Sequence, residues 1–140
     1  MEKKHRAVFP TPYRSTEASE CIRFRYIYCQ CYEIVLPGGV TIVTDPFISG
    51  AVDDFTIDDL SGADYIILSH THFDHDMDTR KIWDKFHGRI ICLKEVAMDI
   101  AEFFDIPYSN IYAVSENCTY YMLDFTLQTF HGLHDNRKAR

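Results

Sequence analysis

Hydrophobic and polar positions alternate with a period of two through the first part of the chain. In CIRFRYIY, residues 21–28, isoleucine and aromatic side chains fall on one face and the two arginines on the other. CYEIVL, residues 31–36, and VTIVTD, residues 40–45, continue as strands around a Pro-Gly-Gly turn. Pro46 cannot donate to a strand ladder, so the third strand should end at Asp45. The pattern predicts an antiparallel meander.

The second part of the chain alternates short apolar runs with helical stripes. YIIL, residues 65–68, and RIICL, residues 89–93, are continuous apolar runs that favour strands buried on both faces. The predicted helices span residue 78 or 79 to 86, and 95–104. The other predicted elements are a helical turn near 57–60 and strands in 110–114, 119–123 and 124–130, the last two forming a hairpin. Helices and strands therefore alternate after the meander.

The composition fits one globular domain, or one half of a larger one. The chain has 140 residues, of which 46% are apolar and 14% aromatic, enough for a hydrophobic core. The net charge of -7 argues against a nucleic-acid surface. No apolar run approaches membrane-spanning length, which argues against a membrane partner. Residues 1–20 are polar and are expected to form a flexible arm rather than a secretory signal.

The five cysteines indicate a reducing compartment, because their spacing matches no disulfide framework. With no secretory signal, a cytoplasmic protein is expected. Cys29 and Cys31 lie in an apolar and aromatic stretch with no second pair to complete a metal site, so buried or half-buried thiols are expected there. The face formed by Arg23 and Arg25 is expected to be solvated.

One stretch, SHTHFDHDMD at residues 69–78, gathers metal-ligating side chains at the end of a predicted buried strand. If the loop is extended, His70, His72 and Asp74 lean to the same side, and His75 adds a fourth donor at the turn into the helix. Imidazole nitrogens and carboxylate oxygens are ligands for Zn, Mn or Fe. So many of these groups in six residues are costly unless a cation neutralises them. The sequence therefore predicts a metal site.

HTHFDH, residues 70–75, matches the H-x-H-x-D-H signature of the metallo-β-lactamase superfamily. The opening run IRFRYIYCQCYEIVLPGGVTIVTDPF resembles the meander of its simple hydrolases. DDLSGADYIILSHTHFDHD resembles the ascorbate-6-phosphate lactonase branch, and the whole resemblance covers roughly 22–134. It implies an α+β fold, the αββα sandwich. Residues 21–140 would form the N-terminal αβ half, a mixed sheet with helices on one face.

The resemblance also implies roles for individual residues. His70, His72 and a histidine after a later strand would bind the first metal, and Asp74 and His75 a second. Asp74 would also hold or deprotonate the attacking water, and Asp45 would orient the motif loop without binding metal. The later histidine is expected to be His134, in the loop past the strand; the alternative is His131, directly after Phe130.

The implied activity is metal-dependent hydrolysis of a small-molecule ester, lactone, amide or phosphoester through a metal-activated water. One or two zinc ions are expected, with manganese or iron as alternatives. The family's flavo-diiron oxidoreductases have glutamate at the position of His72, so the histidine favours hydrolysis over oxygen chemistry. The superfamily's glyoxalase-like and dioxygenase branches share this histidine.

The chain departs from the family pattern because it ends six residues after His134, before any bridging aspartate or final histidine. One sheet face would lack its partner layer. Three readings stay open: a truncated domain, a natural half that pairs with another chain or forms a homodimer over the exposed sheet face, or a non-catalytic member. In each, the chain alone is expected to be weakly active or inactive. A metal-binding or interaction half-domain is the alternative function.

Overall fold

A six-stranded mixed sheet organises the computed structural model, which describes residues 21–134. Its strands, in spatial order, are β1 (Arg23–Tyr28), β2 (Cys31–Val35), β3 (Thr41–Thr44), β4 (Tyr65–Ile67), β5 (Arg89–Leu93) and β6 (Ile111–Val114). β1 to β3 pair antiparallel, as the meander prediction requires, and β3 to β6 pair parallel. The predicted arm over 1–20 and the end of the predicted domain, 135–140, lie outside the described residues.

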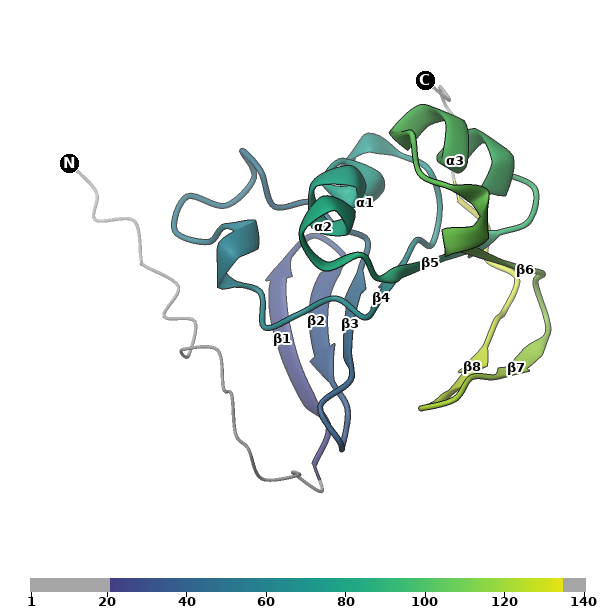
Figure 1. Cartoon of the computed structure of the whole chain (residues 1–140), viewed down its shortest axis with the longest axis horizontal. Helices are drawn as coiled ribbons and strands as arrows, with labels where there is room; N and C mark the ends of the chain where they lie inside the picture. Colours follow the sequence, from purple (N-terminus) through teal and green to yellow (C-terminus); the bar gives the residue numbers. More distant parts are fainter. Residues whose placement is uncertain (1–20, 135–140) are drawn as a thin grey trace.

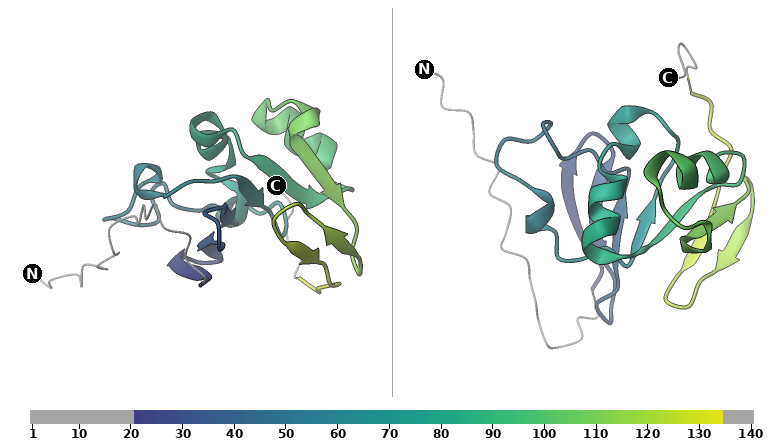
Figure 2. Two further views of the ribbon diagram at one scale, coloured as in Figure 1. Left: turned by 60° about the horizontal axis from the view of Figure 1, so that its bottom comes forward. Right: turned by 45° about the horizontal axis from the view of Figure 1, so that its top comes forward.

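The helices lie on one face of this sheet and a hairpin lies on the other (Figures 1 and 2). The helical elements are η1 (Ile57–Asp59), α1 (Phe73–Asp76), α2 (Thr79–Phe86), α3 (Ala97–Phe104) and η2 (Tyr108–Asn110), and the hairpin pairs β7 (Thr119–Tyr121) with β8 (Thr126–Gln128). This arrangement confirms the predicted α+β class, with a mixed sheet and helices on one face. No helix within 21–134 is both long and apolar enough to traverse a bilayer.

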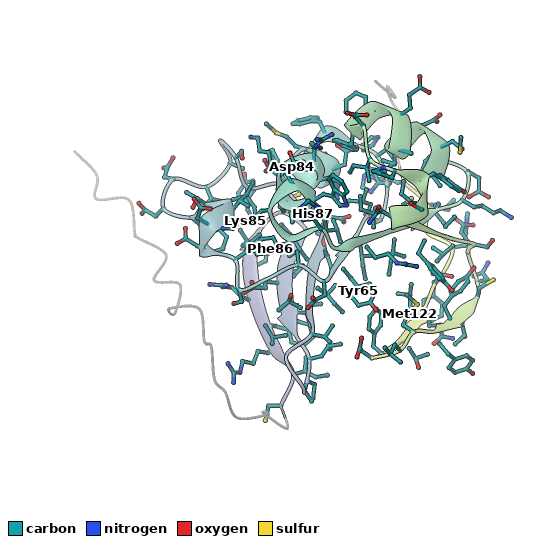
Figure 3. The ribbon with its side chains drawn as sticks, in the orientation of Figure 1. Tyr65, Asp84, Lys85, Phe86, His87 and Met122 are labelled. Carbon is teal, nitrogen blue, oxygen red and sulfur yellow. The ribbon has the colours of Figure 1, made fainter. Side chains whose placement is uncertain are left out.

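Successive side chains of the parallel strands point to opposite faces of the sheet, where different elements cover them. Ile66 of β4 and Ile90 of β5 are fully buried in one cluster with Ile82 of α2. Each such side chain contributes about 1.5–3 kcal/mol by leaving water. On the other face, Tyr65 meets the ring of Phe125 in the hairpin, with ring centroids 5.0 Å apart. Tyr65 and the hairpin's Met122 are both labelled in Figure 3.

In β1, the position of Arg25 differs from the predicted solvated arginine face. Arg25 points into the protein, with its side chain only 11% exposed, and forms an ion pair with Glu33, its cross-strand partner. The guanidinium also lies 5.1 Å from the ring centre of Phe55. The opposite, aromatic face is open, with Phe24 69% and Tyr26 55% exposed. The predicted solvated arginine face is therefore wrong for Arg25, because a buried carboxylate across the ladder requires a cation.

Candidate metal centre

The candidate site lies at the edge of the sheet where β3 and β4 end. These neighbouring strands are parallel, so the residues that follow them, Asp45 and Ser69, emerge side by side. β1 runs in the same direction as β3, because both are antiparallel to β2. The tight turn after β1, which contains Cys29, therefore lies at the same edge.

Three histidine rings converge at this edge. His70, His72 and His134 each direct one ring nitrogen into a group whose members lie within 4.8 Å of one another. Nδ1 of His72 lies 3.1 Å from Nε2 of His70 and 3.0 Å from Nε2 of His134. Nitrogens bound to a tetrahedral zinc at about 2.1 Å would be about 3.4 Å apart.

Hydrogen bonding alone does not account for this convergence. A neutral imidazole nitrogen carries either one proton or one lone pair, so Nδ1 of His72 can make only one conventional hydrogen bond. Yet two other ring nitrogens lie within hydrogen-bond distance of it. A cation among the three rings would satisfy all three lone pairs at once. The donor set and its spacing therefore fit a metal such as zinc.

Asp45 and Ser69 determine which nitrogen of His70 carries the proton. The Ser69 hydroxyl lies 2.7 Å from Oδ2 of Asp45, and because an ionised carboxylate only accepts, the hydroxyl donates to it. The Ser69 oxygen then accepts from Nδ1 of His70, at 2.8 Å. Nε2 of His70 is left with a lone pair directed toward the other histidines. The backbone N–H of Ser69 also donates to Asp45, at 2.7 Å.

Burial and neighbouring histidines act on His70 together. Removal from water lowers the pKa of His70 below its ordinary value, and the charges of His75, His72 and His134 lower it further. Both effects favour the neutral ring. A neutral imidazole is the form that binds a metal ion, so this environment is compatible with a metal role for His70.

Asp74 and His75 belong to a second group of donors, separate from the three histidines. The predicted extended loop is wrong beyond His72, because α1 begins at Phe73 and ends the alternation of side chains. Asp74 instead lies in the group that contains His75, with Nε2 of His75 3.8 Å from a carboxylate oxygen of Asp74. The two groups remain adjacent, since the ring centres of His70 and His75 are 4.0 Å apart.

The two candidate histidines of the C-terminal segment lie in different surroundings. His134 joins the histidine cluster, with its ring centre 4.8 Å from that of His72. The ring of His131 instead lies 2.7 Å from a carboxylate oxygen of Glu116, and its backbone N–H donates to the side chain of Asn117. The metal role of His134 stays a prediction, and its position is compatible with that role.

A cavity of about 410 Å³ opens beside the histidine cluster. His70 and His134 are among its lining residues. Much of the remaining lining consists of apolar side chains from the sheet and hairpin, among them Ile91, Leu93 and Leu127. A cavity of this size could hold a small organic molecule beside the histidines.

Two residues of the site were missed by sequence reasoning. Ser69 is adjacent to the motif, and a hydroxyl next to the first histidine was a signal that could have been used. Cys29 was expected to be a buried or half-buried thiol, and it is half-buried. However, its sulfur, a carboxylate oxygen of Asp74 and a ring nitrogen of His75 lie within 4.8 Å of one another. No local pattern indicates this contact, because it joins two distant turns.

A mixed sheet with three converging histidines at its carboxyl edge is a candidate metal-binding arrangement. Comparison with known proteins identifies the family of the chain. The family model described as the metallo-beta-lactamase superfamily matches residues 26–117. The chain therefore belongs to the metallo-β-lactamase superfamily.

Curated relatives agree with this assignment. A protein of Enterococcus faecalis named UPF0173 metal-dependent hydrolase is 41% identical over 69 residues, 49% of this chain and 30% of that protein. A protein of Caldivirga maquilingensis with the same name is 33% identical over 64 residues, 46% of this chain and 28% of its own length. The matched part of the chain thus spans less than a third of these relatives.

The fold also resembles a solved structure. A protein described as a novel metallo hydrolase from the hyperthermophilic archaeon Ignicoccus hospitalis superimposes with a TM-score of 0.63. The match covers 72% of this chain and 42% of that protein, at 18% sequence identity. This likeness supports the fold.

Proposed function

We propose that this chain carries the first metal site of a zinc-dependent hydrolase that cleaves an ester, lactone, amide or phosphoester bond. The observation that carries the proposal is the convergence of His70, His72 and His134 at the edge of the sheet. Membership of the superfamily, and relatives named metal-dependent hydrolases, support the same conclusion. Manganese or iron are the alternatives to zinc for a site with these donors.

The chemistry of the proposed site follows from general properties of its donors. Three neutral imidazoles leave an ion with an open position, and bound zinc lowers the pKa of water toward about 7 and polarises a carbonyl or phosphoryl oxygen. His70 would direct the lone pair of Nε2 toward a bound ion, because its Nδ1 donates to Ser69. Asp45 accepts the hydroxyl of Ser69 and so helps to hold Ser69 in this position.

Asp74 is the proposed catalytic residue. Its side chain is 37% exposed, so its carboxylate is accessible to solvent while it lies beside His75. An ionised carboxylate in this position can orient an attacking water and accept its proton. The apolar cavity next to His70 and His134 would hold the organic part of a small substrate.

The proposal is tested by measuring hydrolysis of a panel of nitrophenyl esters and phosphodiesters by the zinc-loaded chain. We expect weak turnover that disappears with a chelator and falls at least tenfold in His72→Ala, since the ion loses one of three protein ligands. His131→Ala is the matched control, because that ring contacts Glu116 instead of the cluster. Turnover that survives both the chelator and His72→Ala would refute the proposal.

One observation favours a second candidate function, a metal-binding half-domain that associates with another polypeptide. Phe24 and Tyr26 are largely exposed on the hairpin side of the sheet, and contiguous exposed aromatic surface usually marks an interface. We propose a homodimer through this face for the chain on its own. Light scattering of the purified chain should then give twice the monomer mass of 16.4 kDa, and Phe24→Ser should return it to monomer.

A further inference from the structure

The second donor group contains a thiol that the superfamily's motif does not supply. The sulfur of Cys29, in the turn between β1 and β2, lies within 4.8 Å of a carboxylate oxygen of Asp74 and of a ring nitrogen of His75. Asp74 and His75 belong to the metal-ligating motif, whereas Cys29 is more than 40 residues earlier in the sequence. The topology of the sheet brings the two turns together at one edge.

His75 is oriented as a metal ligand would be. Its Nδ1 lies 3.0 Å from Oδ2 of Asp45, and because the carboxylate only accepts, Nδ1 carries the proton. The lone pair is therefore on Nε2, which is the nitrogen that lies 3.8 Å from Asp74. A histidine that donates to a buried carboxylate through one nitrogen and directs the other at a donor group is typical of metal sites.

The backbone conformation of this turn does not favour cysteine, which suggests a functional reason for the thiol. Cys29 has φ 52°, in the left-handed region that favours glycine, asparagine or aspartate. A cysteine in this region has the steric cost of its Cβ and does not offset it with the local side-chain hydrogen bonds that asparagine or aspartate can form. The same residue is half-buried rather than packed in the core, so hydrophobic burial explains it only in part.

We propose that Cys29 is a thiolate ligand to a second metal ion, held together with Asp74 and His75. This inference rests on the proposed metal-dependent function, and it supplies a third protein donor for the second ion. On binding, the Cys29 thiol loses its proton to solvent and its sulfur forms a bond to the ion. Imidazole, carboxylate and thiolate together suit zinc, and the sulfur disfavours manganese and magnesium.

The test is a cobalt(II) titration of the full chain, followed by absorption spectroscopy. Cobalt replaces zinc in such sites, and a cobalt–thiolate bond adds a charge-transfer band in the near ultraviolet, which histidine ligands do not produce. We expect wild-type protein to bind two ions per chain and to show this band. Cys29→Asn, which suits the left-handed turn, should lose the band and bind the second ion at least tenfold more weakly.

Two controls separate this inference from the proposed function. Cys21→Ser removes an exposed thiol outside the cluster and should leave the band unchanged. His72→Ala removes a ligand of the first site and should reduce the visible absorption of histidine-bound cobalt while the charge-transfer band remains. Cadmium should also bind Cys29→Asn more weakly than wild type, with manganese binding little changed.

The outcomes are distinct. If the charge-transfer band persists in Cys29→Asn, the Cys29 assignment is wrong and the histidine site is unaffected. The same conclusion follows if the wild-type protein binds two cobalt ions but shows no charge-transfer band. Wild-type protein that binds no cobalt at all would overturn both the Cys29 site and the proposed function.

Discussion

Nδ1 of His75 lies 3.0 Å from Oδ2 of Asp45, and this buried contact joins the two candidate metal groups. The same carboxylate accepts the hydroxyl of Ser69, which fixes the ring of His70. One aspartate therefore sets the orientation of a histidine in each group. Its backbone φ is 36°, in the left-handed region that aspartate adopts more readily than most residues, and this conformation lies at the end of β3 where the two groups meet.

Replacing the carboxylate of Asp45 should weaken metal binding without removing any ligand. In Asp45→Asn, an amide group faces three donors: the backbone N–H of Ser69, the Ser69 hydroxyl and Nδ1 of His75. It must present its own N–H groups to at least one of them. We expect zinc affinity to fall about 10–100-fold, measured by competition with a chromophoric chelator. Asp84→Asn, on the exposed side of α2, is the control and should bind as wild type does. Equal affinities would show that Asp45 does not orient the ligands.

The Arg25–Glu33 pair should be important for stability. Glu33 is 3% exposed, so Arg25→Ala would leave a carboxylate buried without its cation. We expect the free energy of unfolding, measured by urea denaturation, to fall by about 3–5 kcal/mol. In the double variant Arg25→Met with Glu33→Leu, most of this loss should be recovered. Lys85→Ala, which removes an exposed pair with Asp58, should cost about 1 kcal/mol or less.

A close backbone contact at Gly88 should make substitution there destabilising. Gly88 follows α2, whose end is marked by Phe86 and His87 in Figure 3. A Cβ at Gly88 would lie 1.9 Å from the carbonyl oxygen of Ala63. The backbone would have to move, and we expect Gly88→Ala to lower the free energy of unfolding by about 1–3 kcal/mol. Thermal denaturation measures this loss. A Cβ at Gly132 would meet no atom within 4 Å, so Gly132→Ala is the control and should change stability little in the same measurement.

Cys92 should make the protein sensitive to alkaline pH. Burial raises the pKa of the Cys92 thiol from its ordinary 9.0 to about 11. The folded state therefore holds the proton more tightly than the unfolded state does. The resulting stabilisation is complete below pH 9.0 and is lost as pH rises toward about 11. In Cys92→Val the free energy of unfolding should decline less steeply over this range. Identical slopes would contradict the prediction.

Much of the fold could be predicted from local sequence patterns. The apolar runs around Ile66 and Ile90 predicted buried strands because burial on both faces leaves no polar positions. The four-residue α1 was missed because it is too short to show a helical period, and its N-cap residue His72 makes no side-chain capping bond. Its start at Phe73 moves Asp74 from the first donor group to the second.

The parts of the site that depend on distant contacts could not be predicted in the same way. The inward position of Arg25 follows from Glu33 across the ladder, and that register is set by the whole sheet. Cys29 lies beside Asp74 because of the order of the strands in the sheet. The alternation of side chains along a single strand does not reveal that order. The metal motif was visible because its donors are close in sequence.

The central claim is that His134 completes a metal site with His70 and His72. Its most direct test is elemental analysis of the purified chain after zinc loading and dialysis, compared with His134→Ala and His131→Ala. We predict that His134→Ala loses about one zinc ion per chain relative to wild type, whereas His131→Ala loses none. Wild-type zinc content in His134→Ala, or no zinc in the wild-type chain, would contradict the account.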